Sequence, residues 1–298
     1  MTPAAERVRS RLDAGLVPAV PVPFRGRVFD PAALASYTRW MAAYPVAGVA
    51  VNVHTGRGRH LPTQVRRDVL SAWRAALPDR LVIAGAWNEA SAAEARDLGA
   101  DAVLAFAPKD EDAAVYHASL AAHLPVLAFY LYEAAGGRGY TDAVLRSILE
   151  LPGVVGVKVA TLDSVITFQR LAALCRTIPQ SLLVTGEDRF LGYSLLLGAR
   201  AALIGMGAAV TDVQLELMRA GAAGDWPRFV RLAGVLDRFG AATFTEPMEG
   251  CIRRMLWAAA EEGAIPPDAC DDPWGPALPS AERDTVRRAV QDARAALG

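Results

Sequence analysis

Residues 154–160 read Val-Val-Gly-Val-Lys-Val-Ala, an apolar run with one lysine inside it. The chain of 298 residues has only two lysines against 29 arginines, so Lys158 is an unusual cation in an unusual place. Seven other short apolar runs occur along the chain, separated by longer segments of helical pattern. They span residues 16–24, 48–56, 81–87, 101–108, 125–132, 181–187 and 201–208. Runs that are apolar throughout are typical of strands covered on both faces.

Eight strand–helix units in succession predict a parallel (β/α)8 barrel, the TIM barrel of the α/β class. Residues that commonly begin helices follow several of the runs: Asp30 before Pro31, then Thr141, Asp163, Asp188 and Thr211. An open doubly wound sheet has the same alternation, but it needs a glycine-rich phosphate loop after the first strand. Residues 22–28 read Val-Pro-Phe-Arg-Gly-Arg-Val instead, which favours the barrel.

The alternation stops near residue 225. Three helical segments follow, at residues 226–246, 247–263 and 280–297, with a connector rich in proline and aspartate at 265–279. We therefore expect a barrel over residues 1–225 and a C-terminal helical extension over residues 226–298 that packs on it.

The composition narrows the class of protein. With 53% apolar and 21% charged residues, the chain is expected to fold around a large core. A net charge of −1 without a basic block argues against nucleic-acid binding. Cys175, Cys251 and Cys270 are far apart and form no metal-binding spacing, which favours a reducing compartment. Neither a signal peptide nor a long apolar stretch is visible, so we expect a cytoplasmic protein without membrane contact.

Active sites of such barrels lie at the carboxyl ends of the strands, so the residues that close each run are the candidates. They are His54, Thr55 and Gly56; Trp87, Asn88 and Glu89; Lys109 and Asp110; Tyr130 and Tyr132; Lys158; and Gly186, Glu187 and Asp188. A lysine removed from water can lose its proton and attack a carbonyl to form a Schiff base. The competing interpretation is a strand-end lysine whose ammonium group reaches solvent.

Alternation of side chains predicts which residues share a face with the lysine. It places Lys158 with Val154 and Gly156. On the run before, it places Tyr130 and Tyr132 together with Ala128 toward the site, and Phe129 and Leu131 toward the helices. A tyrosine hydroxyl near an imine-forming lysine can move protons, although either tyrosine could also be an ordinary core residue.

A metal site is the first rival interpretation. His54 is the one histidine at a strand end, and no HxH or HExxH spacing occurs, so we expect no metal. His54 itself remains open between an acid–base group, a hydrogen-bonding partner of a substrate hydroxyl and a structural residue.

These residues resemble the dihydrodipicolinate synthase/N-acetylneuraminate lyase superfamily of Schiff-base enzymes over nearly the whole chain. The resemblance rests on an ordered set of short matches: Val20-Pro21-Val22-Pro23-Phe24, His54-Thr55-Gly56, Gly99-Ala100-Asp101-Ala102, Gly156-Val157-Lys158, Gly186-Glu187-Asp188 and Gly198-Ala199. The lysine strand is the most specific of them.

The resemblance implies a mechanism and a set of site residues. Lys158 would form an imine with pyruvate or another 2-oxo acid, and Tyr130, or else Tyr132, would be the catalytic tyrosine. Substrate contacts would come from His54, Thr55, Gly56, Gly186, Glu187 and Leu203, the last through its backbone carbonyl. No cofactor would be needed beyond the covalent imine. The resemblance also implies a homo-oligomer, a tetramer or a dimer.

The chain departs from the family's pattern at several of these positions. His54 and Arg57 replace the first threonine and the glutamate of the family's Thr-Thr-Gly-Glu loop. Pro108-Lys109-Asp110 replaces the Pro-Tyr-Tyr segment that sends a tyrosine into a neighbouring subunit. These changes remove two of the three relay groups of the lysine-biosynthesis enzyme, so a standard dihydrodipicolinate synthase is not expected.

The leading hypothesis is thus a pyruvate-type aldolase or a 2-keto-3-deoxy sugar-acid dehydratase. Arg138 could pair with a second carboxylate or phosphate on the substrate, or it could be a solvated loop cation. The alternative hypothesis is a barrel that binds a 2-oxo acid or sugar acid and has lost turnover.

Overall fold

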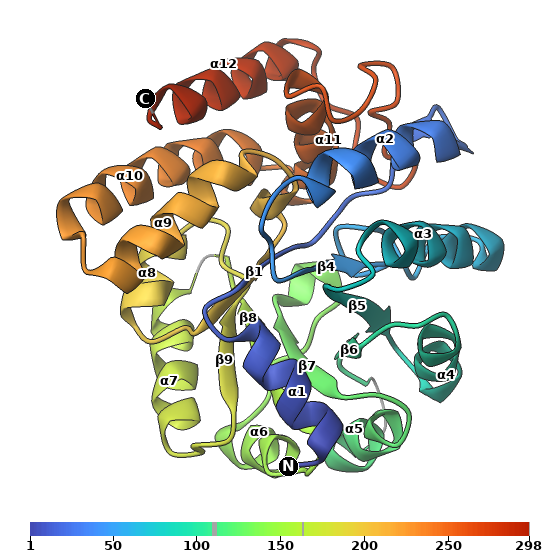
Figure 1. Cartoon of the computed structure of the whole chain (residues 1–298), viewed down its shortest axis with the longest axis vertical. Helices are drawn as coiled ribbons and strands as arrows, with labels where there is room; N and C mark the ends of the chain where they lie inside the picture. Colours follow the sequence, from blue (N-terminus) through green and yellow to red (C-terminus); the bar gives the residue numbers. More distant parts are fainter. Residues whose placement is uncertain (109–111, 163, 298) are drawn as a thin grey trace.

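The computed structural model describes residues 1–108, 112–162 and 164–297. Its main sheet has eight parallel strands in the order β1-β10-β9-β8-β7-β6-β5-β4 (Figure 1). They are β1 (Leu16–Pro18), β4 (Gly48–Val51), β5 (Leu81–Ala86), β6 (Ala102–Ala105), β7 (Val126–Leu131), β8 (Val154–Ala160), β9 (Leu182–Thr185) and β10 (Ala201–Ile204). A parallel bridge between Ala19 and Ala50 closes the sheet into a barrel. The predicted (β/α)8 barrel is confirmed, with one barrel strand in each of the eight runs.

Helices surround the barrel (Figure 1). They are α1 (Pro3–Leu12), α2 (Pro31–Ala42), α3 (Thr63–Ala76), α4 (Glu89–Asp97), α5 (Ala113–Ala121), α6 (Asp142–Leu149), α7 (Val165–Arg176), α8 (Leu191–Leu196) and α9 (Thr211–Ala223). Short connecting elements are the antiparallel pair β2 (Phe24–Arg25) and β3 (Val28–Phe29), and the single turns η1 (Glu133–Ala135) and η2 (Met206–Ala208).

Two of the predicted helix starts are confirmed. Asp30 accepts a hydrogen bond from the amide of Ala33 at the start of α2, and Thr141 accepts one from Val144 in α6. Two others are wrong. Thr211 is already the first helical residue of α9. The carboxylate of Asp188 accepts a hydrogen bond from the buried amide of Met206 at 2.6 Å and so does not cap α8. Asp163, Lys109 and Asp110 lie outside the described residues.

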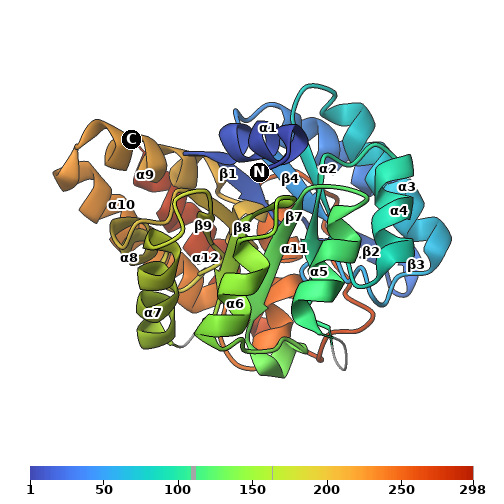
Figure 2. The same cartoon turned by 90° about the horizontal axis from the view of Figure 1, so that it is seen from below.

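The barrel strands separate two apolar layers, because successive side chains point to opposite faces. Val82 and Val103 belong to the outer layer beneath the helices. The barrel interior is filled by a second cluster that includes Leu104, Leu127 and Phe129. Ala5, Val8 and Leu12 of helix α1 also belong to this interior cluster, as do residues at the starts of the strands. It therefore covers the amino-terminal end of the barrel (Figure 2), and the opposite end remains for a site.

The C-terminal segment forms α10 (Trp226–Thr243), the turn η3 (Met248–Gly250), α11 (Cys251–Glu261) and α12 (Ala281–Ala295). Leu232, Leu236 and Phe239 of α10 join the outer apolar layer of the barrel. After α11 the chain returns to β2, where the amide of Asp271 donates to the carbonyl oxygen of Phe24. The expected boundary at residue 225 falls between α9 and α10. Across the described part of the chain, no helix combines the length and the apolar character needed to cross a membrane.

Candidate active site

Lys158 lies inside the barrel, near the carboxyl end of β8. The residue is only 5% exposed, and its Nζ atom is 4.3 Å from the centre of the Phe129 ring. Gly186, just after β9, lies against the lysine stem, because a Cβ atom there would be 2.5 Å from Cε of Lys158. Burial lowers the pKa of the lysine, although the charges of Asp188 and Glu187 oppose this shift. The amine is thus enclosed and easier to deprotonate than an exposed lysine.

The predicted face of Lys158 needs one correction. Val154 belongs to the outer layer, whereas Val155 belongs to the barrel interior. The pairing of β7 with β8 shifts here, since Val126 pairs with Val154 and Leu127 pairs with Gly156. One extra residue in β8 changes the alternation at the start of the strand. Lys158 therefore does not share its face with Val154, as the simple alternation predicted.

The predicted facing of the strand β7 tyrosines is also wrong. Phe129 and Leu131 point into the barrel, where they join the interior cluster. Tyr130 points outward instead. Its hydroxyl accepts a hydrogen bond from Nη2 of Arg170 at 3.4 Å, and its ring packs on that of Tyr140. This geometry excludes Tyr130 as the proton shuttle for Lys158.

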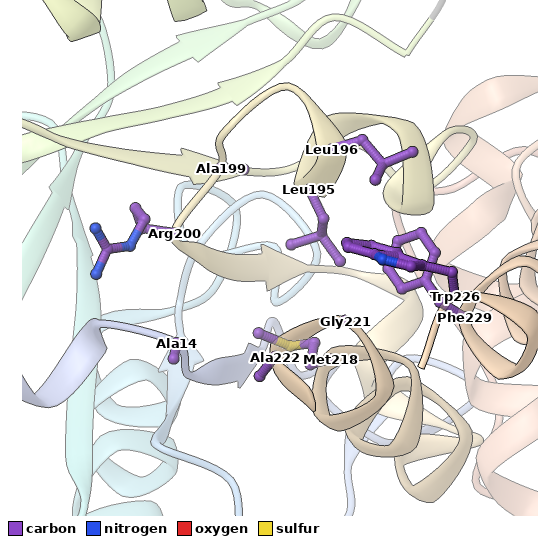
Figure 3. Close-up of a pocket in the computed structure, with 10 residues that line it drawn as sticks. All are labelled: Ala14, Leu195, Leu196, Ala199, Arg200, Met218, Gly221, Ala222, Trp226 and Phe229. Carbon is purple, nitrogen blue, oxygen red and sulfur yellow. The ribbon is translucent and has the colours of Figure 1, made fainter. Parts of the chain in front are cut away.

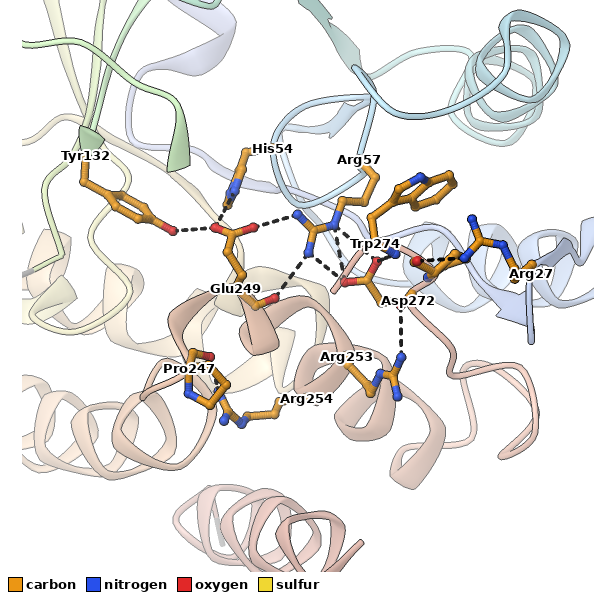
Figure 4. Close-up of polar contacts among 11 residues, drawn as sticks. Arg27, His54, Arg57, Tyr132, Pro247, Glu249, Arg253, Arg254, Asp272 and Trp274 are labelled. Atoms are coloured by element: carbon orange, nitrogen blue, oxygen red, sulfur yellow. Dashed lines mark hydrogen bonds and ion pairs between the residues drawn. The ribbon is translucent and has the colours of Figure 1, made fainter. Parts of the chain in front are cut away.

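Tyr132 follows the last residue of β7 and packs against the interior cluster. Its hydroxyl donates a hydrogen bond to Oε1 of Glu249 at 3.1 Å (Figure 4). Burial raises the pKa of Tyr132 well above its ordinary value, and the charge of Glu249 raises it further. The charge of Asp188 raises the pKa of Tyr132 and also that of Lys158. Tyr132 is therefore a protonated hydroxyl at this end of the barrel.

Glu249, in the turn η3, joins three side chains from the barrel. Nε2 of His54 lies 2.9 Å from Oε1, the same oxygen that accepts from Tyr132. The other oxygen, Oε2, accepts from Nη1 of Arg57 at 2.6 Å. Burial raises the pKa of Glu249, but the hydrogen bonds and charges of His54 and Arg57 outweigh burial and lower it to about 2. Glu249 is a carboxylate at neutral pH.

Arg57 ties this carboxylate to a second acidic residue of the C-terminal segment. Its Nη2 atom donates to Oδ2 of Asp272 at 2.8 Å, and its Nε donates to Oδ1 at 3.2 Å. The Asp272 side chain is 1% exposed and also accepts from the amide of Trp274. Figure 4 shows the chain of contacts from Tyr132 through Glu249 and Arg57 to Asp272. Two carboxylates therefore hold one buried guanidinium in place.

The loop after β4 brings Thr55 and Gly56 to the same end of the barrel. Thr55 is buried, and its hydroxyl lies 3.3 Å from the position that a Cβ atom of Gly205 would occupy. A Cβ atom on Gly56 would lie 3.1 Å from the amide nitrogen of Asn52, so glycine keeps this turn tight. Leu203 on β10 is fully buried in the interior cluster. Binding of a substrate carboxylate by these residues stays a prediction.

Glu187 and Arg138, two further expected substrate contacts, bind other parts of the chain in this structure. Glu187 is fully buried, and its carboxylate accepts hydrogen bonds from the amides of Thr161 and Leu162 and from the Thr161 hydroxyl. This geometry supports a role in holding the turn after β8 and does not support a direct substrate contact. Nη1 of Arg138 donates to the carbonyl oxygen of Pro108 at 3.3 Å, and its contact with a substrate anion stays a prediction.

A cavity of about 350 Å³ opens beside this network. It is lined by Val53, His54, Arg57, Gly58, Arg59, His60, Phe106, Ala135 and Gly136. The guanidinium carbon of Arg59 lies 5.8 Å from the centre of the Phe106 ring. The lining thus combines apolar surface with cationic side chains, a combination suited to a small organic anion.

A second cavity, of about 280 Å³, lies among α8, α9 and α10 (Figure 3). Its lining is largely apolar and includes Leu195, Met218 and Trp226. Arg200, its one charged lining residue, pairs with Asp13. None of the lining residues belongs to the interior cluster around Lys158. This cavity therefore carries no group suited to the imine chemistry.

The sequence interpretation missed Glu249 and Asp272, because both follow the barrel by many residues and neither stands in a recognisable motif. A signal for them did exist. Arg57 replaces an acidic residue of the resembled family, and a buried arginine requires a carboxylate partner. Among the described residues, no group of three or more His, Cys, Asp or Glu side chains is arranged to hold a metal ion.

No protein-family model matches the sequence, and no curated protein matches it either. Several solved structures are similar to the structure of this chain. Dihydrodipicolinate synthase from Agrobacterium tumefaciens str. C58 has a TM-score of 0.82 at 24% identity, over 96% of this chain and 99% of that one. N-acetylneuraminate lyase from Mycoplasma synoviae has a TM-score of 0.78 at 18% identity, over 95% and 98%.

Ruminococcus gnavus sialic acid aldolase has a TM-score of 0.83 at 19% identity, over 96% and 98% of the two chains. This enzyme has also been solved as a catalytic lysine mutant. At these identities the shared property is the arrangement of the backbone. The chain adopts the same (β/α)8 fold as dihydrodipicolinate synthase and N-acetylneuraminate lyase.

Proposed function

We propose that the protein is a Schiff-base-forming lyase of the dihydrodipicolinate synthase/N-acetylneuraminate lyase superfamily, acting on a 2-oxo acid. The observation that carries the proposal is Lys158, an enclosed amine whose pKa is lowered by burial, inside the barrel near the carboxyl end of β8. Active sites of this fold are built at that end. The catalytic lysine of the structurally similar R. gnavus aldolase adds support.

In the proposed reaction, the neutral amine of Lys158 attacks the ketone carbon of the 2-oxo acid. The resulting carbinolamine loses its hydroxyl group as water, after Tyr132 donates a proton to that oxygen. The protonated imine then accepts the electron pair of a breaking bond. Thr55 and Gly56 would hold the substrate carboxylate. The imine itself is the electron sink, so no cofactor is required.

The bond that breaks depends on the substrate. Carbon–carbon cleavage would make the protein a pyruvate-type aldolase, and loss of water would make it a 2-keto-3-deoxy sugar-acid dehydratase. The cavity of about 350 Å³ that His54 and Arg57 line supports the proposal, because it offers space for a small organic anion beside the network. His54 and Arg57 replace groups of the dihydrodipicolinate synthase pattern, and this favours a substrate other than that of the lysine-biosynthesis enzyme.

Borohydride trapping tests the proposal. The protein is incubated with pyruvate, with other 2-oxo acids and with 2-keto-3-deoxy sugar acids, then reduced and mapped by mass spectrometry. The expected result is one reduced adduct on Lys158. The sequence offers an internal control, since Lys109 is the only other lysine. An adduct on Lys109 alone, or no adduct with any acid, contradicts the proposal. An adduct without product release identifies the alternative, a binding protein that has lost turnover.

A further inference from the structure

We propose that Glu249 relays protons between Tyr132 and His54 during imine formation, so that the C-terminal extension completes the catalytic machinery. This inference rests on the proposed function and goes beyond it. Its basis is a single carboxylate oxygen: Oε1 of Glu249 lies 3.1 Å from the hydroxyl of Tyr132 and 2.9 Å from Nε2 of His54. The two donors come from the ends of different strands, and the acceptor comes from η3.

The carboxylate is held in the geometry that a relay needs. Its second oxygen, Oε2, accepts from Arg57, and Arg57 is itself fixed by Asp272. Rotation of the carboxylate would break the contact with Arg57, a short charged hydrogen bond inside a partly buried site. Oε1 therefore stays directed at Tyr132 and His54.

His54 gives the relay access to solvent. It lines the cavity of about 350 Å³, whereas the hydroxyl of Tyr132 is directed at the carboxylate. A carboxylate can only accept hydrogen bonds, so Nε2 of His54 carries a hydrogen in this arrangement. An imidazole is also the side chain best suited to exchange protons with water near neutral pH.

The proposed transfer is balanced at each atom. Tyr132 gives its proton to the departing hydroxyl of the carbinolamine, which leaves as water. The phenolate then recovers a proton through Oε1 of Glu249, which takes it from Nε2 of His54. As its Nε2 proton leaves, His54 takes up a proton from solvent at its other ring nitrogen, so the imidazole stays neutral. This proton balances the one that Lys158 releases to solvent when its amine becomes neutral. Glu249 is ionised before and after the transfer, and no oxidant or metal is involved.

The first test compares Glu249→Gln with the wild type in the rate of pyruvate adduct formation. The glutamine keeps the shape of the side chain but cannot take up a proton. We expect the maximal rate to fall by about 10- to 100-fold, with little change in the pyruvate concentration that gives half of that rate. Glu246→Gln is the matched control, because Glu246 lies in the same segment and contacts the amide of Met248. Its rate should equal that of the wild type.

Two further measurements separate a relay from a structural role. In Glu249→Ala, added formate should restore part of the rate, since a small acid can occupy the vacated position. The double variant His54→Gln/Glu249→Gln should lose no more rate than the slower single variant, because both residues act in one path. Circular dichroism shows whether each variant is folded. If Glu249→Gln does not fold, the single variant His54→Gln tests the relay, because it removes the residue that exchanges protons with solvent.

The outcomes distinguish the two proposals. If the wild type forms no adduct with pyruvate or any other 2-oxo acid, the proposed function and the relay both fail. If the wild type forms the adduct and Glu249→Gln forms it equally fast, the relay alone fails. Additive rate losses in the double variant, or no rescue by formate, also overturn the relay.

Discussion

The hydroxyl of Tyr132 donates a hydrogen bond to Glu249, a residue 117 positions further along the chain, at 3.1 Å. Tyr132 belongs to the barrel and Glu249 to the C-terminal extension, so this bond joins the two parts of the chain at the carboxyl end of the strands. The extension is therefore part of the candidate site and does more than cover the outside of the barrel.

Replacement of Lys158 should abolish the borohydride-trapped adduct. Arginine keeps the positive charge but cannot form the imine, and methionine keeps the length of the stem without an amine. We expect Lys158→Met to be at least as stable as the wild type, because burial disfavours the charged lysine. Adduct mass and thermal unfolding measure the two effects. Lys109→Arg is the control, and an adduct that survives in Lys158→Met would identify another nucleophile.

The two tyrosines near the end of β7 should respond differently to loss of the hydroxyl. Tyr132→Phe is expected to slow adduct formation by about 10²- to 10⁴-fold, because it removes the proposed proton donor. Tyr130→Phe should leave the rate near that of the wild type, since Tyr130 faces Arg170 and Tyr140 outside the barrel. Rapid-quench trapping with pyruvate measures both rates. Equal effects of the two substitutions on the rate would contradict the outward direction of Tyr130.

Gly186→Ala should displace the lysine. The added Cβ atom would lie 2.5 Å from Cε of Lys158 and 2.9 Å from Cβ of Ala160, closer than carbon atoms can approach. We expect a loss of about 1–3 kcal/mol in the free energy of unfolding and slower adduct formation, by about 100-fold. Gly234→Ala in α10 is the matched control, because its Cβ atom would meet only an ordinary contact at 3.8 Å. A rate for Gly186→Ala equal to that of the control would show that the lysine adapts freely.

The contribution of Glu249 to stability should depend on pH. The pKa of Glu249 is lowered from 4.5 to about 2 in the folded protein, so ionisation of this group favours the folded state above pH 4.5. That contribution should be lost as the pH falls from 4.5 toward 2. The difference in free energy of unfolding between the wild type and Glu249→Gln is therefore expected to be constant at neutral pH and to shrink in acid. Denaturant unfolding at several pH values measures it, and a difference that is independent of pH would contradict the assignment.

Asp272→Asn should be strongly destabilising. It removes a charge from a buried ion pair and leaves Arg57 with Glu249 as its remaining carboxylate partner in the network. Breaking such a pair costs about 3–5 kcal/mol. The neighbouring Asp271→Asn is the control, because Asp271 accepts from the exposed amide of Gly26. This substitution should lower the free energy of unfolding by about 0.5–1.5 kcal/mol. Denaturant unfolding measures the loss in free energy of unfolding for each variant. Similar losses in the two variants would show that the Arg57–Asp272 pair contributes little to stability.

The barrel could be predicted from the sequence because its signal is local. Each of the eight strands lies within a short apolar run, and Asp30 and Thr141 mark the helices that follow. The facing of individual side chains was less predictable. One extra residue in β8 reversed the expected facing of Val154. In β7 the alternation holds, but Phe129 and Leu131 take the interior face, so Tyr130 points outward.

By itself the sequence determined where the eight strands lie along the chain and that Lys158 stands within a covered strand. It also indicated the class of chemistry that a buried amine permits. Only the tertiary structure decided which of the two tyrosines packs against the barrel interior and which carboxylate accepts its hydrogen bond. The reason is physical: apolar periodicity is encoded over a few neighbouring residues, whereas the contact of Tyr132 with Glu249 depends on how distant segments pack at one end of the barrel.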